Sequence, residues 1–330
     1  MAMTRVTIKD VAVSLGLSVS TVSRALNDKG DVDPKTRKKV KEKAVELGYF
    51  PNMVAKALKG KVLGLLGVVI DDNANPFYAE VVKGMERQAR KYGFHLLLVN
   101  TSADYEEQVF AVDFLQSKGV DGILIAPVDD TKPYEMEALR VPFVVVGRHF
   151  EEGDFVEVYN DEVLGGYLAT KHLLDGGRRN IVTIQPAMNI YPTRGRSEGY
   201  RKALIEFSAE LYNQSRELKS SPEQAGNSLK EYIKTQGLPD AIFAYNDMYA
   251  LEVITCLKGR KLRVPEDVAV VGYDDIPYSV YVHPALTSVA LDKEWMGRTS
   301  VELLVRMVQG EELKKKKYIQ KPVLRVRDSG

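Results

Sequence analysis

The stretch TIKDVAVSLGLSVSTVSRALN, residues 7–27, predicts two short helices joined by a tight turn. Thr7 and Asp10 have the spacing of a capping box at the start of the first helix. Gly16 is suited to end that helix because glycine adopts the left-handed conformation without strain. Ser18 can cap the second helix. A small apolar core is then expected from Val11, Ala12, Leu17, Val22 and Leu26.

The residues that follow this stretch predict a third helix and then a short hinge. Asp33 and Pro34 form a helix start, and Gly48 is placed to end the helix. The run MVAKALKG, residues 53–60, can form only two turns, which are not stable alone and need a partner surface. Residues 1–60 hold 12 Lys/Arg and 6 Asp/Glu, a net charge of +6. The remaining residues hold 34 Lys/Arg and 39 Asp/Glu, a net charge of −5. This asymmetry predicts a nucleic-acid-binding segment on a larger body.

Length and composition set the broad class of protein. A chain of 330 residues favours two or three compact units, and 45% apolar with 28% charged residues is ordinary for a soluble protein. The N-terminus lacks the apolar run of a signal peptide, and no stretch is apolar for the roughly 20 residues of a membrane span. Cys256 is the only cysteine, which excludes an intrachain disulfide and a cysteine metal cluster. We therefore expect a cytoplasmic protein without cofactor or metal.

From Val62 onwards, apolar runs of strand length alternate with helical stretches. Expected strands lie at 62–70, 95–100, 122–127, 142–147, 180–185, 241–246 and 268–275, with a weaker one around 211–218. Expected helices lie near 77–92, 105–118, 161–175, 195–207, 222–236 and up to about 259. Continuous apolar strands divided by helices indicate parallel sheets covered on both faces. The number of such units favours two doubly wound lobes over one sheet.

Polar side chains follow several of these strands. In open α/β sheets, ligands bind beyond the carboxyl ends of the strands, so two facing lobes would place these residues in one cleft. Amide, carboxylate and guanidinium groups beside an aromatic ring suit the hydroxyls and apolar face of a sugar. The residues concerned are Asp71, Asp72, Asn73, Asn75, Phe77, Asn100, Thr101, Arg148, His149, Asp161, Asn246, Asp247, Asp274 and Asp275.

The second helix of the opening stretch carries side chains suited to reading base pairs. A helix-turn-helix places its second helix in the major groove, where Arg can pair with guanine and a Val methyl can contact thymine. The exposed side of that helix would present Val19, Ser20 and Arg24, with Thr21 and Ser23 beside them. The alternative is that residues 1–50 form a small helical bundle with a solvated basic face.

Motifs along most of the chain resemble the lactose-repressor/galactose-repressor (LacI-type) family of bacterial regulators. The resemblance starts in residues 7–27, continues through 33–52 and the hinge 53–60, and runs nearly to the C-terminus. The later motifs are NPFY (75–78), GVDGILIAP (119–127), RSEGYRKAL (196–204), AYNDMYAL (244–251), VPEDVAVVGYDD (264–275) and PALTSV (284–289).

The resemblance implies an architecture and residue boundaries. It implies an all-α helix-turn-helix headpiece over 1–50, a hinge helix or linker over 51–60, and an effector-binding and dimerisation domain over 61–330. That domain is expected to be an α/β periplasmic-binding-protein-like fold of two doubly wound parallel-sheet lobes. The first lobe would span about 61–160 and 291–318, and the second about 161–290 and 319–330.

The resemblance also implies roles for individual residues. Val19, Ser20 and Arg24 are expected to read bases, and Leu58 to wedge into the minor groove of a kinked duplex. The full expected DNA-binding set is Thr7, Ser18, Val19, Ser20, Thr21, Ser23, Arg24, Asn27, Tyr49, Asn52, Ala55 and Leu58. Arg196, Asn246 and Asp274 match effector-contacting positions, and Asn75, Phe77 and Arg148 are expected contacts from the first lobe. For Asp247 and Asp275 a structural role is an equal alternative, and His149 is either a rim residue or a ligand contact. Tyr191, Arg194 and Trp295 are expected to pack.

The function implied is a regulator that binds a pseudo-palindromic double-stranded operator and a small-molecule effector, a sugar in the commoner case. Two half-sites and the lack of a further C-terminal helix predict a homodimer. A corepressor-type regulator, responsive to a nucleobase or a phosphocarrier protein, remains an alternative. An enzyme is disfavoured because no GxGxxG follows the first strand and no GxxxxGK[ST], HExxH or GxSxG occurs. A periplasmic sugar receptor is disfavoured by the headpiece.

Overall fold

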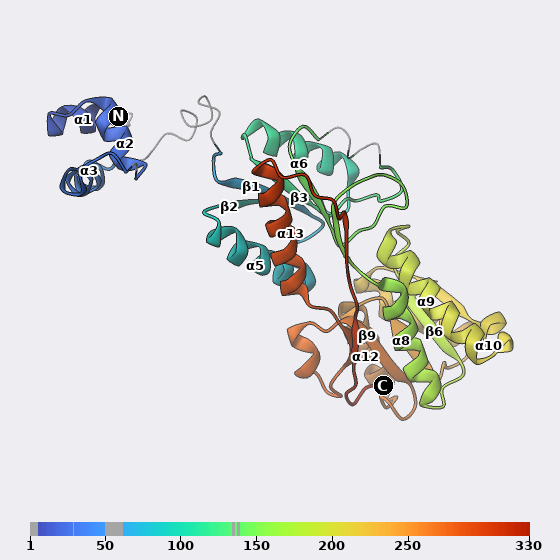
Figure 1. The fold of residues 1–330 in the computed structure, drawn as a ribbon. Helices are drawn as coiled ribbons and strands as arrows, with labels where there is room; N and C mark the ends of the chain where they lie inside the picture. The colour runs from blue at the N-terminus through green and yellow to red at the C-terminus, as the bar shows by residue number, and fades with distance from the viewer. Residues whose placement is uncertain (1–5, 29, 50–61, 134–135, 137–138) are drawn as a thin grey trace. The chain divides into compact units, whose positions relative to one another are not determined.

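The computed structural model describes residues 6–28, 30–49, 62–133, 136 and 139–330. The chain divides into two compact units, Met1–Leu63 and Gly64–Gly330, called here the headpiece and the body. Figure 1 gives the course of the chain in each unit.

The described part of the headpiece contains three helices, and their ends confirm the predicted caps. The helices are α1 (Ile8–Leu15), α2 (Val19–Leu26) and α3 (Pro34–Glu46). The Thr7 N–H donates to Asp10 Oδ2 at 2.7 Å, and the Ser18 and Asp33 side chains accept from the backbone N–H groups of Thr21 and Thr36. Gly16 has φ 63°, the left-handed conformation that the turn requires. The helices enclose one core, formed by Val11, Ala12, Val22, Ala25, Val32, Val40 and Ala44.

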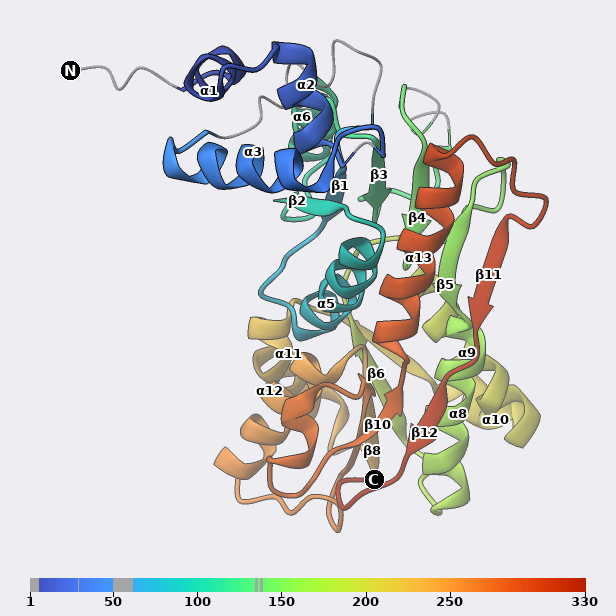
Figure 2. The same ribbon diagram turned by 60° about the vertical axis from the view of Figure 1, so that its left-hand side comes forward.

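The body contains two six-stranded sheets, each with helices on both faces (Figures 1 and 2). The first lobe has strand order β11-β5-β4-β3-β1-β2, and every pair in it is parallel. Its strands are β1 (Leu65–Ile70), β2 (His95–Asn100), β3 (Gly122–Ile125), β4 (Phe143–Val146), β5 (Glu157–Asn160) and β11 (Lys317–Gln320). Its helices are α5 (Pro76–Lys91), α6 (Tyr105–Ser117) and α13 (Lys293–Val308). Separate apolar cores on the two faces of the sheet confirm that the strands are buried on both sides.

The second lobe repeats this plan with strand order β12-β10-β9-β8-β6-β7. Its strands are β6 (Ile181–Gln185), β7 (Arg216–Lys219), β8 (Ala241–Ala244), β9 (Ala269–Asp274), β10 (Thr287–Ala290) and β12 (Val323–Arg325). Its helices are α8 (Glu162–Asp175), α9 (Tyr191–Phe207), α10 (Ala209–Gln214), α11 (Ala225–Gln236) and α12 (Asp247–Gly259), with 3₁₀ turns η1 (Pro222–Gln224) and η2 (Pro277–Val280). Only the edge strand β12 pairs antiparallel among the described strands of this lobe. The fold is therefore two doubly wound lobes.

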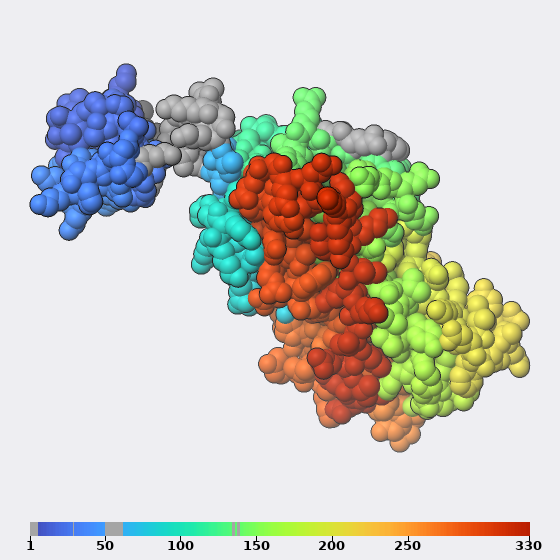
Figure 3. Space-filling view, viewed as in Figure 1, coloured from blue at the N-terminus to red at the C-terminus, as the bar shows by residue number. Residues whose placement is uncertain are grey.

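The chain crosses between the lobes three times. It passes from β5 to α8 near residue 161, from β10 to α13 near 292, and from β11 to β12 near 322. The strand β11 runs to Gln320, two residues beyond the expected crossing at 318. The space-filling view shows the chain from α13 onwards, orange to red, along one face of both lobes (Figure 3).

The structure differs from the sequence-based expectation in several places. No bounds were predicted for any element beyond residue 275, where β10, α13, β11 and β12 lie. The strand β5 was not predicted, because it is only four residues long and begins with a glutamate whose burial depends on tertiary contacts. The weak strand expected around 211–218 was wrong at its start, where α10 runs to Gln214 and β7 begins at Arg216. Ser208 caps α10 by accepting from the backbone N–H of Glu210, which favours the helix locally.

Candidate DNA-reading helix and effector cavity

The helix α2 presents most of its expected base-reading side chains to solvent. Val19 is 41% exposed, and Ser20 and Arg24 are exposed too. Val22 and Ala25 on the opposite side are fully buried in the headpiece core. Exposed and buried residues alternate along α2 with the period of a helix. Packing of the buried side in the headpiece core therefore determines which face of α2 is available to a partner.

Arg24 has an acidic neighbour in the free headpiece. Its guanidinium lies 2.7 Å from the Asp31 carboxylate, and the two side chains are 61% and 47% exposed. An exposed ion pair of this kind contributes only about 0–1 kcal/mol, so a guanine base could replace Asp31 at small cost.

The other expected DNA-binding residues fall into three groups. Thr7, Ser18 and Asn27 act at helix ends, where Asn27 donates its side-chain amide to the Ser23 carbonyl oxygen at 2.6 Å. Thr21 and Ser23 are half-buried on α2, and Tyr49 packs against the headpiece core. The remaining three, Asn52, Ala55 and Leu58, lie outside the described residues.

The body contains a cavity of about 190 Å³ between its two lobes. The structure brings all six expected effector residues to its wall, which are Asn75, Phe77, Arg148, Arg196, Asn246 and Asp274. They come from loops and helix starts at the carboxyl ends of β1, β4, β6, β8 and β9, so parallel topology explains why they meet. Asp71 also lines the cavity, whereas Asn73 and Asn100 bond to each other outside it.

The first-lobe wall combines a helix start with a buried arginine. Asn75 caps α5 by accepting from the Phe77 backbone N–H at 3.0 Å. The Phe77 ring lies edge-on to Tyr78 with centroids 5.2 Å apart. Arg148 is only 6% exposed and donates to the Gly147 carbonyl oxygen at 3.1 Å.

The second-lobe wall is organised around Arg196. Its Nε donates to Glu162 at 2.8 Å, and its Nη2 lies 3.7 Å from the Asp274 carboxylate. The guanidinium carbon lies 3.7 Å from the Tyr273 ring centroid and 4.4 Å from that of Tyr245. Two carboxylates and two aromatic faces therefore hold this cation rigidly.

Close packing of α8 on α9 brings Glu162 and Arg196 together. A Cβ at Gly166 on α8 would lie 2.2 Å from the Arg196 carbonyl oxygen on α9, so only glycine permits this approach. The start of α8, where Glu162 lies, is thereby held beside Arg196. Glycine at this position is thus a structural requirement of the cavity wall.

Asp274 stands in a strained backbone conformation at the end of β9. Its φ is 97° and that of Asp275 is 48°, both in the left-handed region. The Lys293 ammonium, 7% exposed at the start of α13, donates to both carbonyl oxygens and lies 3.0 Å from Glu80 on α5. Burial raises the pKa of Asp274 to about 7 although Arg196 and Lys293 oppose the shift.

Several cavity residues were not among the expected effector contacts. Glu162 is 1% exposed, and Asn160, Tyr245 and Tyr249 also line the wall. Tyr245 directly precedes Asn246 at the end of β8, so the rule that found Asn246 could have found it. Glu162 follows β5, the strand that the sequence pattern missed.

Three residues whose roles were left open, Asp247, Asp275 and His149, make internal contacts in the structure. Asp247 is fully buried and accepts hydrogen bonds from the Ile276 backbone N–H and from two serine hydroxyls. Asp275 pairs with Arg327 at 2.6 Å. The His149 Nδ1 lies 2.7 Å from Glu157, and its ring stacks on Tyr159. All three make internal contacts and do not line the cavity.

Asp247→Ala is expected to lower the free energy of unfolding by about 2–3 kcal/mol, because Ile276 N, Ser279 Oγ and Ser288 Oγ lose their buried acceptor.

Burial raises the pKa of Asp247 to about 6. Its folded state thus binds a proton more tightly than the unfolded chain, so its contribution to stability falls as pH rises from about 4 to 6. Urea unfolding at several pH values would measure both effects. An unchanged midpoint for Asp247→Ala at pH 7 would contradict this structural role.

The residues expected to pack do make internal contacts. Asp130 of the first lobe accepts from the Tyr191 backbone N–H at 2.6 Å and from Arg194 at 2.8 Å, which ties it to the start of α9 in the second lobe. Trp295 packs against the first-lobe core, and Cys256 is buried. Asp130 and Lys293 thus each bridge the two lobes.

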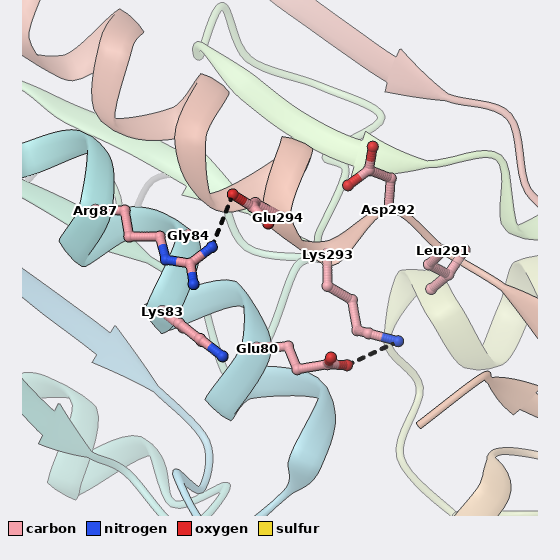
Figure 4. Close-up of a pocket in the computed structure, with 8 residues that line it drawn as sticks. All are labelled: Glu80, Lys83, Gly84, Arg87, Leu291, Asp292, Lys293 and Glu294. Atoms are coloured by element: carbon pink, nitrogen blue, oxygen red, sulfur yellow. Dashed lines mark hydrogen bonds and ion pairs between the residues drawn. The ribbon is translucent and has the colours of Figure 1, made fainter. Parts of the chain in front are cut away.

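A second, charged hollow lies between α5 and the start of α13 (Figure 4). Arg87 pairs with Glu294 there at 3.2 Å, and Lys293 with Glu80. These pairs join the two helices within the first lobe. We therefore assign this hollow to the packing of α5 on α13.

Within the described ranges, no helix has the length and apolar character needed to cross a membrane. The same part of the chain has no group of His, Cys, Asp or Glu side chains that could hold a metal ion.

Comparison with known proteins agrees with this combination of a helix-turn-helix headpiece and a two-lobed body. Residues 7–52 match the family of bacterial regulatory proteins of lacI type, and residues 170–330 match a periplasmic binding protein-like domain. A headpiece of this kind on such a body defines a DNA-binding transcriptional regulator.

Similarity to individual proteins extends over nearly the whole chain. The chain is 32% identical to the ribose operon repressor of Escherichia coli (strain K12), covering 98% of this chain and 99% of the relative. It is also 32% identical to the HTH-type transcriptional repressor PurR of Photobacterium profundum, covering 98% of both. A structure of the Lac repressor dimer bound to operator and the anti-inducer ONPF has a TM-score of 0.87 at 29% identity, covering 99% of both chains. The chain belongs to the lacI family of bacterial regulatory proteins.

Proposed function

We propose that this chain is a repressor of carbohydrate-utilisation genes whose operator affinity is controlled by a small sugar-type effector in the interlobe cavity. The observation that carries the proposal is the meeting of the six expected polar and aromatic side chains in one cavity. Its volume of about 190 Å³ is below the roughly 300–1,000 Å³ of pockets for drug-sized ligands, which favours a monosaccharide.

The proposal includes a cytoplasmic homodimer on a pseudo-palindromic operator. One α2 helix offers few base contacts, so specific binding needs two half-sites. Large apolar side chains exposed on the body support self-association, among them Phe110 at 63% and Tyr281 at 83%. The similarity to the Lac repressor dimer is consistent with this assembly.

The direct test starts from operator selection. Binding to a pool of random duplexes should enrich a pseudo-palindrome, and a thermal-shift screen of monosaccharides should find the effector. Titrating that operator with and without the effector then shows whether the effector releases DNA or promotes binding. A protein that enriches no sequence, or whose operator affinity is the same with every ligand that binds, would not be the proposed regulator.

Asp274→Asn is expected to abolish the effector response while ligand-free operator affinity stays within a few-fold of wild type. The substitution keeps the side-chain shape but removes a carboxylate that lines the cavity. Ligand control requires different contacts in two global states, and losing one lobe's contact removes that difference. Operator titrations of both proteins at saturating effector would measure it. The cavity assignment fails at Asp274 if the variant responds at wild-type effector concentrations.

A further inference from the structure

The two buried arginines of the cavity differ in how their charge is neutralised. Arg196 lies between Glu162 and Asp274, which satisfy its charge within the protein. Arg148 is equally buried, yet no carboxylate oxygen of the described residues lies within 4.0 Å of its side-chain nitrogens. Its Nε has no hydrogen-bond partner there either. A hydrogen bond with Tyr78 and the attraction of Asp130 leave the pKa of Arg148 raised despite its burial. Its guanidinium still has no direct counter-ion among the described residues and can therefore pair with an anionic ligand.

The surrounding backbone favours negative charge at the same place. The starts of α5, α9 and α12 contribute Asn75, Pro192 and Asn246 to the cavity wall. Helix N-termini carry partial positive charge, and these helices have 16, 17 and 13 residues. The cavity therefore combines an unpaired guanidinium with several positive helix ends.

The carboxyl groups of the cavity wall do not neutralise the positive charge of Arg148 and the helix ends. Glu162 and Asp274 are engaged by Arg196, and Asp274 has a pKa raised to about 7 by burial. Asp71 is the remaining carboxyl, and burial raises its pKa although Arg148 opposes the shift. Asp130 already accepts from Arg194 at 2.8 Å. Among these groups, Arg148 is left without a direct counter-ion.

We propose that the effector carries an anionic group, the carboxylate of a sugar acid or the phosphate of a sugar phosphate, which pairs with Arg148. This inference rests on the proposed function, because it names the chemistry of the ligand in that cavity. A planar guanidinium binds two oxygens of either group in a bidentate arrangement. The hydroxyls of the sugar would then face Asn246, Asp274 and the Asn160 oxygen, which also has no partner in the described residues.

The test compares anionic probes with their neutral parents. The probes are D-glucuronate, D-galacturonate, D-gluconate and D-glucose 6-phosphate, each against D-glucose or D-galactose at matched ionic strength. Thermal shift and calorimetry are run on wild type, Arg148→Met, Arg148→Lys and the exposed control Arg260→Met. We expect at least one anionic probe to bind wild type and Arg260→Met about tenfold or more tighter than its parent sugar. That preference should be lost in Arg148→Met and reduced in Arg148→Lys.

The outcomes separate this inference from the proposed function. Preference for a carboxylate probe identifies a sugar acid, and preference for the 6-phosphate identifies a sugar phosphate. Binding only of neutral sugars, or an anion preference that survives in Arg148→Met, overturns the inference but leaves an effector-controlled repressor in place. The absence of binding by every anionic probe overturns it as well. Loss of sequence-specific DNA binding would instead refute the proposed function.

A folding control accompanies the binding data. Arg148→Met gives up hydrogen bonds to the Gly147 carbonyl oxygen and to Tyr78 but no ion pair, so its melting temperature is expected to fall much less than that of Arg196→Ala. A large decrease would mean that Arg148 is already paired inside the protein and would overturn the inference on that ground.

Discussion

Arg196→Ala is expected to lower the free energy of unfolding by about 3–5 kcal/mol, the cost of breaking a buried ion pair. The side chain is 6% exposed, and its loss leaves the Glu162 and Asp274 carboxylates facing each other without a cation. The rings of Tyr245 and Tyr273 also lose the group that lies against them. Urea unfolding followed by far-UV circular dichroism would measure the loss.

Two comparisons distinguish a charge effect from simple loss of packing. The double variant Glu162→Gln/Arg196→Met removes both partners, so it should be less destabilised than the sum of the single variants. The loss in Arg196→Ala should also be smaller at pH 5 than at pH 8. The reason is that Asp274, with a folded pKa of about 7 in the wild type, is protonated at the lower pH and no longer needs a cation. A loss below 1 kcal/mol at pH 8, or one independent of pH, would contradict this account.

Arg24→Ala is expected to cost about 1–3 kcal/mol of operator binding per half-site and to relax preference at one base pair. Arg24 is the only long charged side chain on the exposed face of α2, and its guanidinium pairs with the Asp31 carboxylate. Binding titrations against single-base operator variants would show a flattened preference at that position. Arg24→Lys keeps the charge but loses bidentate pairing, so it should relax the same preference.

Asp31→Asn provides the matched control for Arg24. It removes the acidic partner without altering α2, so operator affinity should be unchanged or slightly higher. If Arg24→Ala weakened binding equally for all sequences, Arg24 would contact phosphate and not a base.

Much of the local structure could be predicted because it depends on neighbouring residues. Thr7, Ser18 and Asp33 satisfy the first backbone N–H groups of their helices, and Gly16 tolerates the left-handed turn, so each end is encoded within a few residues. The strands of the body were found for a similar reason, since parallel strands buried on both faces form continuous apolar runs. Polar residues directly after such strands then predicted the wall of the cavity.

The limits of prediction lie where burial depends on distant partners. The strand β5 begins with Glu157, which is fully buried because it contacts His149 and the Phe150 backbone N–H. No local pattern distinguishes such a glutamate from an exposed one. The same holds for Asp247, whose role as a buried acceptor required residues that lie 29 to 41 positions away.

Local signals were enough to predict the headpiece, the doubly wound lobes and the cavity residues that follow the strands, because caps and apolar periodicity act over short distances, whereas Arg196, within α9, was expected only from the family resemblance. Which of the six expected effector residues are already paired depends instead on the packing of distant segments. Glu162 reaches Arg196 because α8 and α9 approach at Gly166, and Asp274 reaches it from the end of β9, whereas no carboxylate of the described residues reaches Arg148. Charge balance in a buried site depends on distances between segments far apart in the chain, and those distances are set by how helices and sheets pack.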